Sequence, residues 1–573
     1  MRFTSAPSLS LGVGALALLS LAACGGGDDA PPRLAAATPA SLGGTCEALA
    51  AKLAGQADTR IESVTTEAAG KLMQGGQPVA EHCLVKGRMF ERTSAVDGNT
   101  YAIGFEMRLP KAWNGRFYHQ GNGGIDGMVQ PARGALGGGP LTGALQQGFA
   151  VISSDAGHAQ ADGPYFGLDP QARLDYGYQA VGKLTPMAKE TIRRAYGKAP
   201  DRSYFGGCSN GGRHAFIAAT RYADQYDGIL AGAPGFNLPK AAVANIWGAQ
   251  RYATVATGDV TTAAGLETAF NADERRLVSR AVLAKCDALD GARDSLVQDT
   301  GACQATFNIA TDVPTCTGGR DGSCLSAAQK GVIAAIMAGP RTSAGAPVYA
   351  SFPWDAGISG SGIAAWEFNA SISVDRDAGS VPFIFMSPPQ NPVGYDAPAF
   401  ALNTPIDTLV AAINATSGVY TESAMGFMTP PNPTELGTLK NRGAKMLVYH
   451  GVSDPIFSVN DTQAWYDGLR AANGGDASSF AKLYRVPGMG HCSGGPATDQ
   501  FDMLAPLVKW VEQGQAPQAV VASARGTGNA GGVNADVPAD WAPNRTRPLC
   551  PYPQVARYKG SGSLESDQSF SCQ

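Results

Sequence analysis

Residues 207–211 read Gly-Cys-Ser-Asn-Gly, which places a serine between two glycines at the spacing of a nucleophile elbow. A serine hydroxyl attacks a carbonyl well only if a base can reach its proton, so Ser209 must project from a tight turn between a strand and a helix. Glycines at positions 207 and 211 remove the Cβ atoms that would collide in such a turn. No other serine in the sequence fits this pattern. The segment therefore predicts a nucleophilic serine that attacks an acyl group.

Two later segments can supply the acid and the base that such a serine needs. When the serine lies on an elbow of this kind, the acid and then the histidine follow it along the chain. Residues 445–449 form an apolar strand-like run, and Asp454 lies in the loop that follows. Residues 481–486 form the next run, and a loop of small residues then leads to His491. We expect Asp454 to orient the imidazole of His491, and that imidazole to take the proton of Ser209.

The sequence contains only six histidines, so there are few alternatives to His491. Three of them precede the serine and break the expected order. His214 lies inside the helix predicted after the elbow, where a structural role is the simpler interpretation. His450 is the serious rival, but its position at the end of a strand beside the acid favours a positioning role. We therefore predict His491 as the base.

An oxyanion hole needs backbone N–H groups directed at a developing negative charge. The N–H group of Asn210, the residue after the serine, is the expected first donor. The glycine-rich turn at residues 121–124 follows an early strand-like run, and Gly124 is our predicted second donor. A plain turn stays an alternative there, because glycine is abundant at 73 residues.

Alternating strand-like and helical segments predict the scaffold that must position these residues. The helical segment after the elbow covers residues 211–222. The strand-like runs before residue 235 are 101–109, 116–119, 150–154, 202–206 and 228–232. This alternation predicts an α/β-hydrolase fold with a largely parallel sheet.

The alternation stops near residue 235 and resumes near residue 439. We predict that residues 236–438 form an inserted lid domain, and that residues 41–235 and 439–573 form the catalytic domain. A lid over the nucleophile would shape the acyl pocket and so decide the choice of substrate.

Composition limits the classes of function. The 573 residues, 44% of them hydrophobic, are enough for one large domain with an insertion or for two domains. The 44 basic and 48 acidic residues give a net charge of −4 with no long run of one sign. The chain therefore lacks the basic footprint of a nucleic-acid-binding protein, and we expect small or neutral partners.

The N-terminus resembles a bacterial export signal. A basic start precedes an apolar stretch at residues 9–23, and Leu-Ala-Ala-Cys ends it like a lipobox. Residues 1–24 are thus predicted to be a signal peptide whose Cys24 is lipidated, and residues 25–40 a flexible linker. Ordinary cleavage near Ala23 is the alternative. We expect an exported protein, either an outer-membrane lipoprotein or a periplasmic or secreted one.

Export changes the interpretation of the cysteines, because disulfides persist in oxidising compartments. Of the 11 cysteines, ten remain when Cys24 is set aside. Proximity in the sequence, one of many possible connectivities, suggests the pairs Cys46–Cys83, Cys286–Cys303, Cys316–Cys324 and Cys550–Cys572. That choice leaves Cys208, next to the serine, and Cys492, next to the histidine, for each other. The alternative for Cys208 is a small buried residue without a partner.

An acidic loop carries a candidate metal site. Asp287, Asp290 and Asp294 lie within eight residues. Carboxylates at such spacing, supplemented by backbone carbonyls, suit Ca²⁺, although the loop does not match the EF-hand pattern. On the residues alone a solvated acidic turn is the simpler interpretation.

The motifs together resemble the tannase and feruloyl esterase family of α/β-hydrolases over nearly the whole mature chain. The matching stretches are residues 166–170, 207–212, 226–234, 449–454 and 488–492. The resemblance implies that Ser209, Asp454 and His491 form a catalytic triad. It also implies that Gly124 and Asn210 are the oxyanion donors, and that a disulfide between Cys208 and Cys492 ties the serine loop to the histidine loop.

The resemblance adds ligands that spacing leaves open. It implies a structural Ca²⁺ in the lid. The ligands would be the side chains of Asp287, Asp290 and Asp294 and the backbone carbonyls of Ala292 and Leu296. It also implies that Phe457 lines the substrate pocket. The segment 371–380 does not align without gaps with lid residues that hold a substrate carboxylate in the family, so Arg376 stays unassigned.

The expected function is that of an exported serine carboxylesterase that hydrolyses feruloyl, galloyl or terephthaloyl-type esters through an acyl-enzyme. A lipid-anchored binding protein on a hydrolase scaffold, without turnover, is the alternative. A peptidase is a weaker one, since the same triad can cleave amides.

Overall fold

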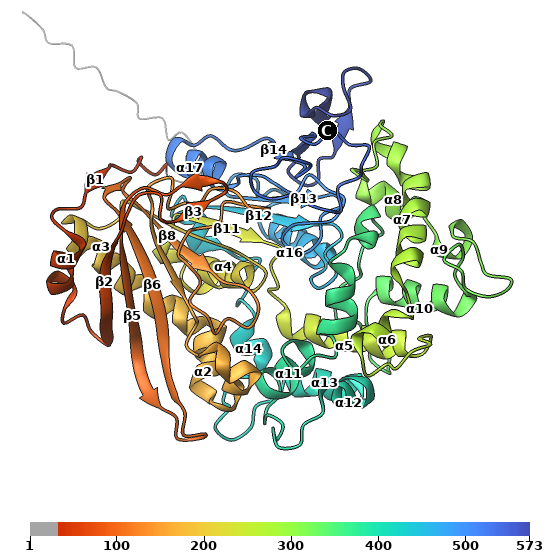
Figure 1. The fold of residues 1–573 in the computed structure, drawn as a ribbon, viewed down its shortest axis with the longest axis horizontal. Helices are drawn as coiled ribbons and strands as arrows, with labels where there is room; N and C mark the ends of the chain where they lie inside the picture. The colour runs from red at the N-terminus through yellow and green to blue at the C-terminus, as the bar shows by residue number, and fades with distance from the viewer. Residues whose placement is uncertain (1–32) are drawn as a thin grey trace, which may run out of the picture. The chain divides into compact units, whose positions relative to one another are not determined.

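The computed structural model describes residues 33–573, and the predicted signal peptide with Cys24 lies outside the described residues. A nine-stranded sheet dominates the described part of the chain (Figure 1). Across the sheet its strands are β13 (Ala481–Val486), β12 (Lys445–Gly451), β11 (Gly228–Gly232), β10 (Arg202–Cys208), β8 (Arg116–Gly121), β9 (Ala150–Ser154), β6 (Thr100–Pro110), β5 (His82–Thr93) and β2 (Thr59–Glu67).

The sheet is mixed. The six strands from β13 to β9 pair in parallel, whereas β6, β5 and β2 continue the sheet antiparallel. The strand predicted at residues 101–109 therefore exists but pairs antiparallel with β9. Periodicity predicts that a strand is present, but the direction of its neighbour depends on the path of the whole chain.

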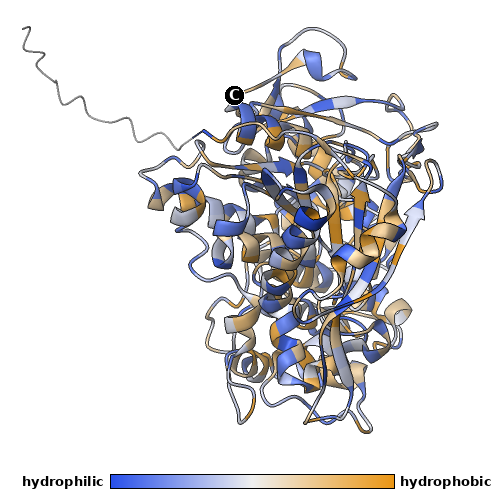
Figure 2. Cartoon of the chain, turned by 90° about the vertical axis from the view of Figure 1, so that its left-hand side faces the viewer, coloured by the Kyte–Doolittle hydropathy of each residue, from blue (hydrophilic) through white to orange (hydrophobic). Residues whose placement is uncertain are grey.

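Burial explains the composition of the strands. β9, β11 and β12 are buried along their whole length, because helices or loops cover both faces of the parallel part of the sheet. The edge strand β2 has no buried residue. Figure 2 shows the hydrophobic colour concentrated on the interior strands and the hydrophilic colour on outer helices and loops.

Two hydrophobic cores lie on the two faces of the sheet. On β10, Phe205 belongs to the core with α1 (Cys46–Leu53), α3 (Ala180–Tyr196), α4 (Asn210–Arg221) and α16 (Val459–Ala472). Its neighbour Tyr204 belongs to the other core, with α17 (Leu504–Gln513). Successive side chains of a strand point to opposite faces, so β10 anchors both layers.

The interval between β11 and β12, which contains the segment predicted as a lid (residues 236–438), consists of helices and loops and adds no strand to the sheet (Figure 1). The helices are α5 (Leu238–Ala253), α6 (Ala263–Glu267), α7 (Ala272–Cys286), η4 (Asp287–Asp290), α8 (Thr300–Thr306), α9 (Ile309–Asp312), α10 (Ala327–Ala338), η5 (Ala356–Ser359), η6 (Ala365–Ala370), α11 (Asp377–Ser380), η7 (Val381–Phe385), α12 (Ala397–Asn403), α13 (Ile406–Ile413), α14 (Ala424–Met428) and α15 (Gly437–Asn441). Within the described residues this insertion and the sheet form one compact unit.

The remaining elements are short. The helices are η1 (Gln160–Leu168), α2 (Pro170–Leu174), η2 (Asp175–Gln179), η3 (Ala223–Gln225) and η8 (Asp567–Ser569). The strands are β1 (Ala40–Ser41), β3 (Met73–Gln74), β4 (Gln77–Pro78), β7 (Ala112–Trp113), β14 (Val520–Ser523), β15 (Thr546–Leu549), β16 (Ala556–Tyr558) and β17 (Phe570–Cys572). No helix among residues 33–573 is long and apolar enough to cross a membrane.

The end of the predicted linker is held against the catalytic domain. The N–H of Ala37 donates to Glu512 at 3.0 Å, and the N–H of Thr38 donates to Asp201 at 2.8 Å. Ala40 then pairs with Trp113 in a two-stranded ladder. The fixed part of the chain thus begins before residue 41, the predicted boundary, because backbone groups of residues 37–40 find distant partners.

Five disulfides are present in the described part of the chain, and they are the five pairs expected from the sequence: Cys46–Cys83, Cys208–Cys492, Cys286–Cys303, Cys316–Cys324 and Cys550–Cys572. Four of them close short loops of the chain. The bridge between Cys208 and Cys492 spans 284 residues. It joins the end of β10 to the loop after β13, at the carboxyl ends of the parallel strands.

Candidate active site

The elbow forms where β10 ends and α4 begins. Ser209 has φ 66° and ψ −126°, a left-handed backbone conformation that is strained for a residue other than glycine. A Cβ atom at Gly211 would lie 2.3 Å from the carbonyl oxygen of Gly121, and one at Gly207 would lie 2.5 Å from the same oxygen. The two glycines are therefore required because the loop after β8 packs directly on the elbow, which confirms the steric reason for the motif.

The three residues predicted to act together converge. His491 Nε2 lies 2.8 Å from Ser209 Oγ, and His491 Nδ1 lies 2.7 Å from Asp454 Oδ2. The N–H groups of Ile456 and Phe457 each donate to Asp454 Oδ1 at 3.0 Å. Serine, imidazole and carboxylate thus form one continuous chain of hydrogen bonds, the arrangement in which a histidine accepts the serine proton.

Asp454 is suited to stabilise a charged imidazole. Burial by itself would raise the pKa of this carboxyl, but attraction to His491 and hydrogen bonds from His450 and His491 outweigh burial and hold the pKa well below its usual range. Asp454 is only 2% exposed. A carboxylate that stays ionised in a buried position strongly favours a positive charge on the adjacent ring.

His450 has the positioning role expected of it. Its ring is fully buried, with Nδ1 2.9 Å from the Thr462 hydroxyl and Nε2 2.9 Å from the Phe457 carbonyl oxygen. The carbonyl can only accept, so Nε2 carries a proton. The same Nε2 lies 3.4 Å from Asp454 Oδ2. His450 therefore fixes the loop that carries the acid.

The two predicted oxyanion donors border the same cavity as Ser209. Asn210 is the first residue of α4, where backbone N–H groups have no partner within the helix. Gly124 has φ +66°, and a Cβ atom there would meet no atom within 4 Å, so its backbone is open toward the cavity. At the preceding residue, Gly123, a Cβ atom would lie 3.7 Å from the Ser209 Cβ. Both donor segments thus flank the serine.

A buried network joins these two segments. Asp126 Oδ2 lies 2.7 Å from the side-chain amide of Asn210 and 2.9 Å from His214 Nε2. Arg213 in turn donates to the side-chain oxygen of Asn210 at 2.7 Å. The loop that contains Gly124 is therefore tied to the first turn of α4 by hydrogen bonds that solvent does not reach.

Burial decides the charge of this network. It raises the pKa of Asp126 to about 8, although Arg213 and the Asn210 hydrogen bond act against it. Burial, followed by repulsion from Arg213, holds the pKa of His214 well below its usual range. At neutral pH the carboxyl and the ring are therefore both neutral, and they contribute hydrogen bonds rather than charge.

The bridge between Cys208 and Cys492 connects the serine loop to the histidine loop. Its Cα atoms are 6.0 Å apart, and each cysteine is the direct neighbour of a triad residue. Cys492 also has a left-handed backbone, with φ +63°. The covalent link limits how far Ser209 and His491 can move apart.

A cavity with an empty volume of about 420 Å³ opens above the serine. Phe457, predicted as a pocket residue, lies on it together with Trp366 of the insertion. The rings of Phe457 and Trp366 lie 5.3 and 5.1 Å from the His491 ring, both at steep angles to it. The other lining residues are Ile125, Tyr176, Leu238, Arg376, Asp377, Ser380, Phe385 and Ile456. Broad apolar walls of this kind suit a flat acyl group.

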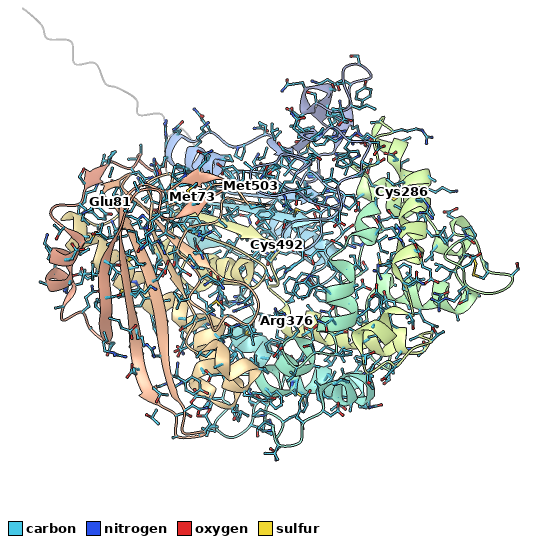
Figure 3. All side chains as sticks on the ribbon, in the orientation of Figure 1. Met73, Glu81, Cys286, Arg376, Cys492 and Met503 are labelled. Atoms are coloured by element: carbon cyan, nitrogen blue, oxygen red, sulfur yellow. A yellow bond between two sulfur atoms is a disulfide. The ribbon has the colours of Figure 1, made fainter. Side chains whose placement is uncertain are left out.

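The insertion also supplies polar groups to this cavity. Arg376 is exposed at its rim and, among the described residues, forms no ion pair. Figure 3 shows its position below Cys492, between the sheet and the helices of the insertion. Burial raises the pKa of the adjacent Asp377 to about 7. Among the residues that line the catalytic cavity, Arg376 is the only lysine or arginine, so it supplies the fixed positive charge there.

The acidic loop is partly organised for a cation. Burial, with repulsion from Asp294 and Asp287, raises the pKa of Asp290 to about 7, and its Oδ2 atom is buried without a hydrogen-bond partner among the described residues. However, Asp294 forms a buried ion pair with Arg547. No three acidic, histidine or cysteine side chains of residues 33–573 converge as metal ligands do. The loop therefore has the oxygen chemistry for Ca²⁺ but also a protein cation that neutralises one of its carboxylates.

Two features of the site carry no signal in the sequence. Trp366 lies in a helical segment far from any catalytic motif and reaches His491 only through the packing of the insertion. Asp126 lies two residues after Gly124, and its partner His214 lies four residues after Asn210. The helical spacing of Asn210 and His214 could have indicated a shared face, but not the carboxyl that meets them.

Comparisons with known proteins find relatives over most of the chain. The family model described as tannase and feruloyl esterase matches residues 83–573. The chain is 42% identical over 547 residues to mono(2-hydroxyethyl) terephthalate hydrolase of Piscinibacter sakaiensis. The aligned region covers 90% of this chain and 89% of that protein. It is 28% identical over 496 residues to a probable feruloyl esterase B of Emericella nidulans. That alignment covers 83% of this chain and 84% of the esterase.

Solved structures show the same fold. Feruloyl esterase B from Aspergillus oryzae superposes with a TM-score of 0.71 at 23% identity and covers 92% of this chain and 99% of its own. Tannin acyl hydrolase from Aspergillus niger superposes with a TM-score of 0.67 at 21% identity and covers 94% of this chain and 96% of its own. The α/β-hydrolase fold predicted from the sequence is confirmed.

Proposed function

Because the chain belongs to the tannase and feruloyl esterase family and is a carboxylic ester hydrolase, we propose that it hydrolyses esters of aromatic acids through an acyl-enzyme on Ser209. The observation that supports this most directly is the hydrogen-bond chain from Ser209 through His491 to Asp454 beneath an aromatic cavity.

In the proposed reaction, His491 takes the hydroxyl proton of Ser209 while Oγ attacks the ester carbonyl. The oxygen of the tetrahedral intermediate accepts hydrogen bonds from the N–H groups of Gly124 and Asn210. His491 then gives its proton to the leaving alcohol, and the acyl group stays on Ser209. A water molecule, deprotonated by His491, attacks the acyl-enzyme and releases the acid with the serine restored. Asp454 stabilises the imidazolium in both halves.

The cavity favours an aromatic acyl group. Trp366 and Phe457 supply flat walls next to the histidine ring. Arg376 is the cation that a free carboxylate on the acyl ring would meet. We propose feruloyl, galloyl or terephthaloyl-type esters as the substrate class, which is also the range covered by the names of the relatives.

An ester panel tests the proposal. Wild-type protein is expected to release acid from at least one of the feruloyl, galloyl and terephthaloyl esters, whereas Ser209→Ala releases none. Ser479→Ala, at an exposed serine, is the matched control and should keep full activity. A fluorophosphonate probe should label wild type and the control but not Ser209→Ala. Ligand binding without turnover or labelling would instead support a binding protein on a hydrolase scaffold.

We propose that the protein is exported and anchored by a lipid on Cys24. Five disulfides support export, because they persist in oxidising compartments. Radiolabelled palmitate should enter the wild-type protein and not Cys24→Ala in a bacterial host. Label in neither protein, with both found free in the periplasm, would contradict the anchor and leave export standing.

We also propose a structural Ca²⁺ at the acidic loop. The buried Oδ2 of Asp290 would bind the ion, with Asp287, Asp294 and the carbonyls of Ala292 and Leu296. The ion would supply positive charge that holds this loop of the insertion. Calcium at a hundred times its dissociation constant should stabilise the wild type by about 2.7 kcal/mol against thermal unfolding. Asp290→Asn should remove that response, whereas an equal response in both proteins would contradict the site.

A further inference from the structure

A second cavity lies beside the catalytic one, and Asp454, the acid of the triad, is among its lining residues. Its empty volume is about 680 Å³, open solvent at its mouth included, compared with about 420 Å³ for the catalytic cavity. The two cavities share no lining residue. The segment η6 separates them, because Trp366 faces the catalytic cavity and the next residue, Glu367, faces the second.

The walls of the second cavity are largely apolar. Its lining includes Trp247 and Tyr252 of α5 and, from later in the insertion, Met337, Phe352 and Ile358. Apolar walls with a few polar groups are typical of small-molecule sites.

Gly248 shows that the packing of α5 leaves this space open. It is a buried residue in the interior of the helix, yet a Cβ atom there would meet no atom within 4 Å. Other buried helical glycines are packed tightly: a Cβ at Gly211 or at Gly212 would lie 2.3 Å from a carbonyl oxygen. Glycine in a helix interior destabilises it relative to alanine, so Gly248 has no local structural advantage. Its benefit is the volume left in the cavity.

Asp355 gives the cavity a polar end. It is 1% exposed, and its Oδ1 accepts hydrogen bonds from the Ser453 hydroxyl at 2.5 Å and from the N–H groups of Gly357 and Gly488 at 3.0 Å. Its Oδ2 is buried and has no hydrogen-bond partner among residues 33–573. A buried acceptor without a donor costs free energy, so this atom favours a ligand that donates a hydrogen bond.

The charges on the wall narrow the ligand further. The ionisable groups that line the cavity are Asp355, Glu367, Asp454 and Tyr252, and no lysine or arginine is among them. Glu367 already accepts a hydrogen bond from the Tyr252 hydroxyl at 2.5 Å. A carboxylate ligand would meet carboxyl groups without a balancing cation, whereas an uncharged hydroxyl can donate to Asp355.

We propose that this cavity is a second ligand site, separate from the catalytic one, for an uncharged aromatic alcohol or phenol whose hydroxyl donates to Asp355 Oδ2. The site goes beyond the proposed esterase activity and does not depend on it. Asp355 Oδ1 contacts the loops of both Asp454 and His491, through Ser453 and Gly488. The ligand would therefore lie next to the supports of the triad without touching Ser209.

Calorimetric titration with benzyl alcohol, and with benzoate for comparison, tests the site. The protein is first labelled at Ser209 with a fluorophosphonate so that the catalytic cavity is blocked; if Ser209 does not label, the Gly248 and Asp355 variants distinguish the two cavities. Benzyl alcohol is expected to bind at least tenfold more tightly than benzoate. Equal affinity for the two compounds would contradict the role of Asp355.

Variants of Gly248 locate the binding. Gly248→Leu should fill the cavity and weaken benzyl alcohol binding at least tenfold, whereas Gly248→Ala should keep the affinity within about threefold and raise the melting temperature. Asp355→Asn, which keeps an oxygen for Ser453, should weaken binding about fivefold to tenfold. Unchanged affinity in a folded Gly248→Leu protein would overturn the proposal. If that variant unfolds, Asp355→Asn is the deciding test. Weaker binding then supports the site, and unchanged affinity overturns it.

Discussion

Two buried histidine and carboxyl pairs belong to the surroundings of Ser209, and their nitrogen–oxygen distances are nearly the same. His491 lies 2.7 Å from Asp454, and His214 lies 2.9 Å from Asp126. Both carboxyls are almost fully shielded from solvent. The pairs nevertheless differ in protonation, because burial is outweighed by two histidines at Asp454 and is not outweighed at Asp126.

The neighbours of each pair explain the difference. The second ring nitrogen of His491 faces the Ser209 hydroxyl, whereas the ring of His214 lies 3.3 Å from the guanidinium of Arg213. Burial and, after it, the adjacent cation hold the pKa of His214 well below its usual range, so His214 cannot serve as a base near neutral pH. Proximity of histidine and carboxylate is thus insufficient for catalysis, and the third group decides the role.

The largest difference is expected when each histidine is removed. His491→Ala should lower kcat for the best ester by about 10⁴-fold or more, because no other group can take the serine proton. His214→Gln should lower kcat by at most about tenfold, since it loses only one hydrogen bond of the Asp126 network. Steady-state kinetics of the two variants measures this. A similar loss in both would mean that the two pairs are not distinct in function.

Replacing each carboxyl by an amide should distinguish the roles of Asp454 and Asp126 nearly as clearly. Asp454→Asn should lower kcat by about 10⁴-fold, because the amide cannot stabilise the imidazolium and favours the wrong tautomer. Asp126→Asn should change kcat by less than about tenfold, since Asp126 is already neutral and the amide has nearly its shape. Circular dichroism should show that both variants are folded. Equal losses would indicate that Asp126 acts as an anion.

The disulfide beside the catalytic pair should have a smaller effect. The double variant Cys208→Ala, Cys492→Ala should lower kcat by about tenfold to a hundredfold, because Ser209 and His491 are then held by packing alone. It should also lose about 2–5 kcal/mol of stability. The double variant Cys316→Ala, Cys324→Ala, in the insertion, is the control for kcat. A loss of stability without any change in kcat would show that the bridge is purely structural.

The smallest effect concerns the pH dependence of stability, where the two carboxyls should act in opposite directions. Asp126 keeps its proton up to about pH 8 when folded but loses it near pH 4 when unfolded, so unfolding releases a proton between these values. Its contribution to stability is therefore lost as the pH rises, by at most about 1.4 kcal/mol per pH unit. The pKa of Asp454 is lowered on folding, so its contribution is lost as the pH falls below about 4.

Urea denaturation between pH 5 and pH 8 measures the Asp126 effect. The free energy of unfolding of Asp126→Asn should fall less steeply with pH than that of the wild type, because asparagine does not titrate. Parallel slopes for the two proteins would show that Asp126 is ionised in the folded state, and would remove the contrast with Asp454.

Much of the catalytic geometry could be predicted from the sequence, because it depends on local backbone requirements. The glycines around Ser209 are needed by the turn itself, and Asp454 and His491 lie in loops that directly follow strands. The antiparallel pairing of β6 could not be predicted in this way, since periodicity carries no strand direction. Trp366 was missed because it reaches His491 through the packing of helices that have no motif.

The sequence alone thus determined the nucleophile, the order of acid and base, and the fold class. These depend on short segments whose conformation is set by nearby residues. Only the tertiary structure decided that Asp454 beside His491 stays ionised while Asp126 and His214 stay neutral, and that two separate cavities have walls from the insertion. The physical reason is that desolvation, charge and cavity shape depend on segments that meet only after folding.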